Sequence, residues 1–359
     1  MPDDKIKLLI FIPSLACGGS EKYVSLLCNN INTQKFAVTL VVLNNDDPFY
    51  TITNPTVALI NLKVQQVKYS FFKIRKLVKQ LQPDIVYCNA NHLNLYFALF
   101  KNLLVPNAIL VARESSVVSI NSKRSKFPVL YNWGLKKFYQ RIDFIICQSQ
   151  YMQLDLMEHY NINKQKTIVI NNPIEENITA LAENKNIQHN KFVTVARLSA
   201  EKGINRLIRS VAILNFPFTY YIIGGGDKNS ALQDLINKLQ LQNKVFLTGQ
   251  KDQPFLGMED AALFLMGSHY EGFPNTLLEA GARGIPVIAF NAPGGISEII
   301  IQGESGLLVN NGDEKAFAAA IEKAMHTNFN RQHIKSETLQ KFSLPMLIKK
   351  TESVFFNLV

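Results

Sequence analysis

Short apolar runs alternate with longer amphipathic segments along the whole chain. The runs are rich in β-branched residues, and the segments between them repeat apolar residues at the spacing of a helix. In the first half, strands are predicted at residues 7–12, 36–43, 84–88, 108–111 and 143–147. Helices are predicted between and after them, at residues 21–31, 71–80, 94–102, 129–141 and 151–159. This alternation is typical of βα units, which build a parallel sheet covered by helices on both faces.

The pattern stops in a polar stretch, residues 175–190, and then starts again. Further strands are predicted at residues 192–196, 219–223, 245–248 and 262–266, and further helices at 204–214, 231–239, 275–283 and 314–325. We therefore expect an α/β protein of two doubly wound, Rossmann-like domains that face each other across a cleft, with ligands at the carboxyl ends of the strands. The expected divisions are an N-terminal domain, a linker, a C-terminal domain and a final helix, at residues 1–173, 174–190, 191–343 and 344–359. The pattern does not specify where the final helix packs.

Composition and charge change this picture in one respect. The chain has 359 residues, of which 47% are hydrophobic, and a formal net charge of +10. The basic excess is uneven, because residues 1–185 contain 21 Lys and Arg against 13 Asp and Glu, whereas residues 186–359 contain 17 against 15. An acidic partner is therefore expected, and the first domain carries most of the excess. A nucleic-acid-binding protein would explain the charge, but the sequence has no recognised nucleic-acid-reading motif, so no nucleic acid is expected.

The cysteines and the apolar runs indicate the compartment. The four cysteines, Cys17, Cys28, Cys88 and Cys147, form no C-x-x-C pair and mostly lie in apolar runs, which is typical of buried free thiols in a reducing compartment. No uncharged apolar run reaches the length of about 18 residues that a membrane span needs. We expect a cytoplasmic protein that can attach to the cytoplasmic face of a membrane.

The strongest local motif follows the predicted strand 262–266. Two glutamates flank a loop and the predicted start of a helix: Glu271, Gly272, Phe273, Pro274, Asn275, Thr276 and Glu279. Unpaired amides and the positive dipole end at such a helix start favour a phosphate, and the two carboxylates can reach hydroxyl groups beside it. On spacing alone, a surface loop with two solvated acids is an equal alternative.

Cations and glycines occupy the corresponding ends of other predicted strands. Arg197 follows strand 192–196, and Lys202 precedes the next helix. Together they could neutralise a diphosphate, Arg through a forked contact and Lys as a mobile point charge. Glycine pairs stand at matching positions of the two domains: Gly18, Gly19, Gly224 and Gly225. The G-x-G-x-x-G fingerprint is absent from both loops, which argues against a dinucleotide dehydrogenase.

Taken together, these motifs resemble glycosyltransferase family 4 of the GT-B fold. The likeness rests on segments in nearly the whole chain: residues 18–22, 196–203, 222–226, 247–249, 271–279 and 303–309. It implies a retaining hexosyl- or N-acetylhexosaminyltransferase that uses a UDP-linked sugar bound by the second domain. The first domain would bind a glycan or polyprenyl-diphosphate-linked acceptor, as in the assembly of bacterial capsule or lipopolysaccharide. A nucleotide-sugar epimerase of the same fold is the alternative.

The resemblance also implies roles for individual residues. Arg197 and Lys202 would hold the donor diphosphate and stabilise the leaving nucleotide. Glu271 would bind hydroxyls of the transferred sugar, and Glu279 would bind the ribose. Further donor contacts fall on loop and glycine positions: Phe273, Pro274, Asn275, Thr276, Gly249, Gly224, Gly225, Gly18 and Gly19. Because no Asp-x-Asp motif occurs and the two cations can replace a metal's charge, neither a metal nor another cofactor is expected.

One position departs from the family pattern. Many members carry a His after the strand that corresponds to residues 108–111, whereas this sequence has Arg113 and then Glu114, which falls at the His position. A carboxylate there can orient or deprotonate an acceptor hydroxyl, and a simple Arg113–Glu114 ion pair is an equal alternative. His92 and Arg113 are further candidates on the acceptor side.

A basic and aromatic stretch, residues 119–141, contains the only tryptophan, Trp133. Its cations are Lys123, Arg124, Lys126, Lys136, Lys137 and Arg141. Basic and aromatic residues on one helix favour peripheral contact with an anionic membrane. A solvated face with aromatic residues in the core is an equal alternative.

Overall fold

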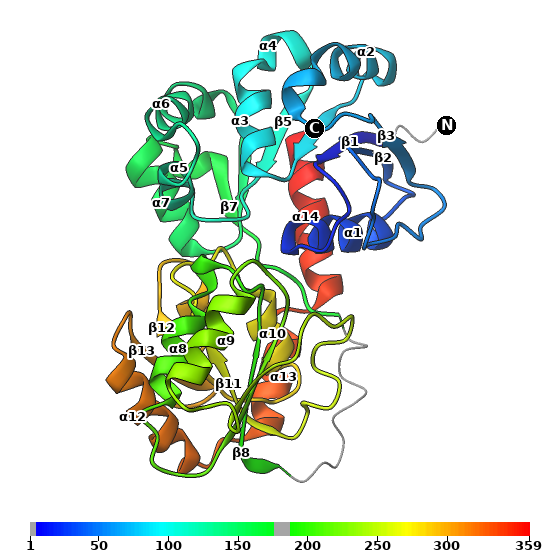
Figure 1. Ribbon diagram of the computed structural model, residues 1–359. Coiled ribbons are helices and arrows are strands. Elements are labelled where there is room, and N and C mark those ends of the chain that lie inside the picture. The colour runs from blue at the N-terminus through cyan, green and yellow to red at the C-terminus, as the bar shows by residue number, and fades with distance from the viewer. Residues whose placement is uncertain (1–4, 176–186) are drawn as a thin grey trace. The chain divides into compact units, whose positions relative to one another are not determined.

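The computed structural model describes residues 5–175 and 187–359 (Figure 1). The chain divides into two compact units. The N-terminal unit comprises Met1–Pro173 and Leu344–Val359, and the C-terminal unit comprises Ile174–Ser343. Each unit is built on a parallel sheet, which confirms the expected pair of Rossmann-like α/β domains.

The sheet of the N-terminal unit has seven strands in the order β3-β2-β1-β4-β5-β6-β7. They are β1 (Ile6–Ile12), β2 (Phe36–Val42), β3 (Ala58–Asn61), β4 (Ile85–Cys88), β5 (Ile109–Arg113), β6 (Phe144–Cys147) and β7 (Thr167–Val169). The central strands are almost entirely buried, as expected for strands covered on both faces. The sequence pattern did not predict β3 and β7, which are short, partly buried edge strands whose apolar runs, residues 57–60 and 168–170, are only a few residues long.

Helices cover this sheet, and one of them comes from the far end of the chain. The helices are α1 (Gly19–Asn30), α2 (Phe71–Leu81), α3 (Asn91–Leu99), α4 (Lys101–Leu104), α5 (Val118–Lys123), α6 (Pro128–Phe138), α7 (Gln150–Tyr160) and α14 (Leu344–Leu358). Figure 1 shows α14 beside α1, where the Tyr23 hydroxyl lies 2.9 Å from Thr351 Oγ1. The Phe355 ring packs edge-on against Phe36 and Tyr87. The C-terminal helix therefore belongs to the N-terminal unit.

The sheet of the C-terminal unit has six strands in the order β10-β9-β8-β11-β12-β13. They are β8 (Gln188–Val195), β9 (Thr219–Ile223), β10 (Val245–Leu247), β11 (Ala261–Met266), β12 (Val287–Asn291) and β13 (Gly306–Asn310). The helices are α8 (Ile204–Val211), α9 (Asn229–Lys238), α10 (Asn275–Gly281), α11 (Ile296–Ile299), α12 (Glu314–Met325) and α13 (Arg331–Lys341). The expected linker, 174–190, overlaps the start of β8, and its residues 176–186 lie outside the described part of the chain.

The burial of the cysteines and the lengths of the helices can be compared with the sequence-based expectations. Cys28, Cys88 and Cys147 are buried free thiols, as predicted, whereas Cys17 is an exposed free thiol. Within residues 5–175 and 187–359, no helix combines the length and the apolar composition that a bilayer crossing requires. In each sheet the strands are parallel, so the loops that leave their carboxyl ends gather at one edge.

Candidate functional site

The adjacent strands β8 and β11 bring two of the predicted donor residues together in the C-terminal unit. Lys202 Nζ lies 2.7 Å from Glu271 Oε1, although the two residues are far apart in sequence. The same carboxylate oxygen accepts a hydrogen bond of 2.6 Å from the Ser268 hydroxyl. The side chains of Lys202 and Glu271 are 27% and 10% exposed. They form a partly buried ion pair that a ligand can still reach.

Two glycines allow the loops that carry this pair to approach each other. Gly203 has a φ of +58°, and a Cβ there would lie 2.0 Å from the Gly267 carbonyl oxygen. Gly294 has a φ of +119°, and a Cβ there would lie 1.6 Å from the carbonyl oxygen of Glu271. The Glu271 amide also donates to the Pro293 carbonyl at 3.0 Å. The backbone on either side of the ion pair is therefore fixed by contacts that a larger residue would exclude.

Arg206 of α8 supports the same loop from inside the unit, and sequence reasoning missed it. Its buried guanidinium donates to the carbonyl oxygens of Gly267, at 2.5 Å, and Ser268, and to Asn311 Oδ1 at 2.7 Å. It also lies over the Phe290 ring, with its central carbon 3.9 Å from the ring centroid. Burial lowers the pKa of Arg206 to about 10, so the group stays protonated at neutral pH. An arginine within the apolar stripe of a helix is the signal that could have identified it.

Arg197 presents a charge to solvent in the loop after β8. The residue is exposed, and its side chain forms no hydrogen bond or ion pair with the parts of the chain that the structure describes. The Leu198 amide, next along the loop, donates to the Gly225 carbonyl at 2.8 Å. An unpaired guanidinium in a loop held by backbone bonds is suited to a forked contact with phosphate oxygens.

The remaining predicted donor residues occupy neighbouring loops of the same unit. The Gly224 amide donates to the Gly249 carbonyl at 2.9 Å, which joins the loops after β9 and β10. Phe273 and Pro274 are buried, whereas the side chains of three residues of α10 are partly exposed: Asn275, Thr276 and Glu279. Gly18 and Gly19, in contrast, lie at the start of α1 in the N-terminal unit. The structure thus collects the predicted donor residues on the C-terminal unit, except for this glycine pair.

Arg113 lies at the end of β5 and does not pair with Glu114. Its buried guanidinium stacks on the Tyr23 ring, 3.6 Å from the centroid, and its Nη2 donates to Asn172 Oδ1 at 2.7 Å. Glu114 turns the other way, because successive side chains of an extended chain point to opposite faces. The Arg113–Glu114 ion pair is therefore wrong as an interpretation of these two residues.

Glu114 is held in the core by neutral partners. Its Oε1 accepts hydrogen bonds from Asn94 Nδ2 at 2.8 Å and from the Tyr139 hydroxyl at 2.9 Å. Burial raises the pKa of Glu114 to about 7, since the charged form loses its hydration there. A general base must contact the proton that it removes, and this enclosed carboxyl offers no exposed surface for such a contact. The predicted direct catalytic contact of Glu114 thus has no support in this geometry.

A groove of about 480 Å³ lies near Glu114 in the N-terminal unit. Its lining includes His92 on α3, Ser115 and Ser116 after β5, and Arg124 after α5. His92, predicted for the acceptor side, is exposed. Arg113, predicted for the same side, does not line the groove.

The segment that follows the lining residue Ser125 exposes apolar side chains. Phe127, Val129, Leu130 and Trp133, in and before α6, are between 51% and 86% exposed. Four lysines beside them are exposed as well: Lys123, Lys126, Lys136 and Lys137. The predicted aromatic stretch is divided: Phe138 and Tyr139 are buried in the core, whereas Phe127 and Trp133 are exposed. We call the four apolar and four lysine side chains the α6 patch.

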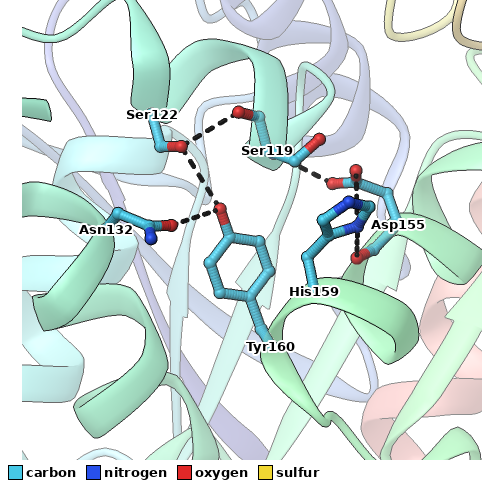
Figure 2. A network of polar contacts seen from close by, with 6 residues as sticks. All are labelled: Ser119, Ser122, Asn132, Asp155, His159 and Tyr160. Atoms are coloured by element: carbon cyan, nitrogen blue, oxygen red, sulfur yellow. Dashed lines mark hydrogen bonds and ion pairs between the residues drawn. The ribbon is translucent and has the colours of Figure 1, made fainter. Parts of the chain in front are cut away.

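A polar network joins the helices α5, α6 and α7 (Figure 2). The Tyr160 hydroxyl lies 3.3 Å from Ser122 Oγ and 3.2 Å from Asn132 Oδ1. The Ser119 amide donates to Asp155 Oδ2 at 3.0 Å. These contacts join three helices, so the α6 patch lies on a fixed part of the unit.

Two protein families match consecutive parts of the sequence. The family described as Glycosyltransferase Family 4 matches residues 17–177, and the family described as Glycosyl transferases group 1 matches residues 175–341. These two matches follow the division of the chain into its two units.

Individual proteins are similar over almost the full length. The N-acetylgalactosamine-N,N'-diacetylbacillosaminyl-diphospho-undecaprenol 4-alpha-N-acetylgalactosaminyltransferase of Campylobacter jejuni is 29% identical over 343 residues, which cover 92% of this chain and 93% of that protein. The amylovoran biosynthesis glycosyltransferase AmsD of Erwinia amylovora is 21% identical over 97% of this chain and 99% of that protein. The crystal structure of HepE from Anabaena in complex with UDP has a TM-score of 0.80 at 19% identity, covering 98% of this chain and 100% of that one. This last likeness concerns the fold.

Proposed function

The chain belongs to glycosyltransferase family 4 and is a glycosyltransferase, and we propose that it transfers a sugar from a UDP-linked donor to a lipid-linked glycan acceptor. The observation that carries the donor assignment is the partly buried Lys202–Glu271 pair in the same unit as the exposed Arg197. The UDP bound to HepE supports UDP as the nucleotide. The diphospho-undecaprenol in the name of the Campylobacter relative supports a lipid-linked acceptor in the assembly of a surface glycan.

The proposed chemistry follows the charges that develop during transfer. Breaking the anomeric bond leaves negative charge on the departing diphosphate, and cations fixed beforehand lower the barrier to its release. Arg197 and Lys202 supply the positive charge that stabilises the departing diphosphate, so we propose that the reaction needs no metal ion. Anomeric configuration is retained, by attack on the same face of the sugar that the nucleotide leaves.

Glu271 has two functions in this proposal. Without a donor, it holds the Lys202 ammonium at 2.7 Å and keeps it in place. When the donor diphosphate binds the Lys202 ammonium, the Glu271 carboxylate oxygens accept hydrogen bonds from hydroxyls of the transferred sugar. Ser268, which donates to the same oxygen, keeps the carboxylate oriented throughout. Glu279, in the helix that follows, binds the ribose of the nucleotide.

Acceptor-dependent release of UDP tests the reaction. The protein is mixed with UDP-glucose, UDP-galactose, UDP-N-acetylglucosamine or UDP-N-acetylgalactosamine, each with and without farnesyl-diphosphate-linked sugars as acceptors. The proposal requires UDP to appear with one donor, and only when an acceptor is present. Conversion of one UDP-sugar into another without acceptor would instead identify an epimerase.

We also propose that the α6 patch attaches the enzyme to an anionic membrane, on the cytoplasmic face. Exposed apolar side chains enter the boundary between headgroups and acyl chains, and lysines beside them attract acidic lipids. The patch lies in the N-terminal unit, where the sequence concentrates its basic excess. A membrane-attached enzyme meets a lipid-linked acceptor in two dimensions rather than three.

Cosedimentation with vesicles tests the attachment. We expect the protein to bind vesicles that contain phosphatidylglycerol and to bind pure phosphatidylcholine vesicles weakly. A variant with Lys123→Glu, Lys136→Glu and Lys137→Glu should lose this binding. The matched control changes three exposed lysines of the C-terminal unit in the same way: Lys238→Glu, Lys315→Glu and Lys323→Glu. Equal losses in both variants would show only a response to net charge and would contradict a docking patch.

A further inference from the structure

The groove of the N-terminal unit contains polar atoms that lack partners. Asn91 is only 8% exposed, and its Nδ2 has no hydrogen-bond partner among the described residues. The hydroxyls of Ser116 and Ser125 are buried and unpartnered in the same way. All three residues line the groove. Because a buried polar group without a partner costs free energy, their common position indicates that a bound molecule completes their hydrogen bonds.

The carboxamide of Asn91 is oriented by a neighbour. Its Oδ1 accepts a hydrogen bond from the Ser115 hydroxyl at 3.2 Å, so the acceptor end of the amide is occupied and the donor end is left. Asn91, the first residue of α3, and Ser115, in the loop after β5, meet at this wall. Two residues of the groove lining therefore hold, close to its surface, polar atoms without partners in the described part of the chain: the oriented N–H donor of Asn91 and the hydroxyl of Ser116.

The structure behind the wall explains why it stays in position. Asn94, one turn further along α3, donates to the Arg113 carbonyl at 3.0 Å and to Glu114 Oε1 at 2.8 Å. These bonds tie the helix that carries Asn91 to the end of β5, from which Ser115 and Ser116 follow. Glu114 thereby acts as a positioning residue, since it holds the wall without lining the groove.

We infer that this groove binds the terminal sugar of the acceptor, and that Asn91 selects it by donating a hydrogen bond to a sugar oxygen. The inference rests on the proposed function and names the residues of its acceptor side. Sugar hydroxyls suit the wall because each one both donates and accepts hydrogen bonds. Such a hydroxyl can accept from the Asn91 N–H and can donate to or accept from the hydroxyls of Ser116 and Ser125. The lining also contains one cation, Arg124, and one carboxylate, Glu21, so Arg124 can contact the phosphate that links such a sugar to its lipid while Glu21 accepts from sugar hydroxyls.

Asn91→Asp is the decisive variant. Aspartate has the same shape and keeps an oxygen for the Ser115 hydroxyl, but it replaces the N–H donor with a second acceptor. If Asn91 binds the sugar, Asn91→Asp and Asn91→Ala should both raise the KM for a farnesyl-diphosphate-linked sugar about ten-fold or more. The KM for the UDP-sugar should not change. If Asn91 only holds Ser115, Asn91→Asp should behave as the wild type does, and this result would overturn the inference.

Two further variants separate binding from folding. Ser116→Ala should raise the acceptor KM by a few-fold, whereas Ser119→Ala is the matched control, because Ser119 does not line the groove. The thermal midpoint of each variant shows whether the unit still folds. Glu114→Gln keeps an oxygen for Asn94 and Tyr139, so it should retain the wild-type acceptor KM, while Glu114→Ala should raise it. A wild-type enzyme that releases UDP with none of the acceptors would contradict the proposed function itself, which distinguishes that failure from this one.

Discussion

The two units place charged side chains near the carboxyl ends of their sheets in opposite ways. In the C-terminal unit, Lys202 and Glu271 face each other at a partly open position, and Arg197 is exposed. In the N-terminal unit, Arg113 and Glu114 are fully buried and point to opposite faces. The same architecture thus produces charges that a ligand can reach in one unit and charges that serve the core in the other.

The difference arises from where each residue stands relative to the end of its strand. Arg113 is the last residue of β5, and the Glu114 amide still bonds to the neighbouring strand through the Ile146 carbonyl at 2.9 Å. Both side chains therefore remain between the sheet and its covering helices. Lys202 and Glu271 stand several residues beyond β8 and β11, in loops that glycines allow to approach each other. Distance past the strand end decides whether a charge meets solvent.

The largest effect on kcat is expected from substitutions that break the Lys202–Glu271 pair of the C-terminal unit. Lys202→Ala and Glu271→Ala should each lower kcat about 10³-fold, because each removes a preorganised charge or hydrogen-bond acceptor from the transition state. Far-UV circular dichroism and the thermal midpoint should stay close to those of the wild type, since a partly exposed ion pair contributes little to stability. Lys238→Ala, at an exposed lysine of α9, is the control and should keep full activity. Wild-type turnover in either variant would end the donor-site assignment.

The next effect tests whether the loops must approach so closely. Gly294→Ala places a Cβ 1.6 Å from the carbonyl oxygen of Glu271 at a φ of +119°, so the backbone must move. We expect a loss of about 3 kcal/mol in the free energy of unfolding, measured by urea denaturation, together with a lower kcat. Gly257→Ala is the matched control, because Gly257 also has a positive φ, of +80°, but no heavy atom within 4 Å of a Cβ. Equal losses at both positions would mean that backbone strain alone matters and that the contact with Glu271 does not.

Which helices and strands the sequence predicts depends on how deeply each element is buried. The buried central strands are marked by clear apolar runs, whereas the runs at β3 and β7, on the sheet edges, are short and only partly buried. Helix α13 was missed because only Ile334 within it is buried, so its sequence has no apolar stripe. Strands β12 and β13 were also missed, although β12 is a buried apolar run and both lie between the predicted helices 275–283 and 314–325.

The candidate site was predictable where a motif named its residues. Lys202 and Glu271 were expected at one site from their motifs, and the structure brings them into contact. Arg206 was not found, because its role depends on three acceptors in two distant loops that only the folded chain assembles. The sequence left two interpretations of Arg113 and Glu114 open, and the direction of each side chain from the strand excluded the ion pair.

The buried carboxyl of the N-terminal unit should make stability depend on pH. The folded pKa of Glu114, about 7, lies above its ordinary value of 4.5, so the folded state binds the proton more tightly than the unfolded state does. Stability from this group is therefore complete below about pH 4.5 and is lost as the pH rises to about 7. The shift corresponds to roughly 3 kcal/mol. Glu114→Gln should remove this dependence and make the protein more stable than the wild type at pH 8 but not at pH 4.5, as urea denaturation at the two pH values would show. Parallel pH profiles of the two proteins would contradict a buried, protonated Glu114.

The smallest effect distinguishes charge from geometry at the open position of the C-terminal unit. Arg197→Lys keeps the positive charge but replaces a planar fork with a single ammonium, so it should lower kcat about ten-fold, whereas Arg197→Ala should lower it further. Steady-state release of UDP measures both. Because Arg197 makes no side-chain bond with the described residues, neither substitution should change the free energy of unfolding by more than about 0.5 kcal/mol. The buried Arg113 supplies the contrast: Arg113→Lys loses the stacking on Tyr23 and should destabilise the fold without such a direct effect on turnover. If Arg197→Lys were as active as the wild type, the guanidinium fork would have no part in holding the diphosphate, and charge alone would account for the site.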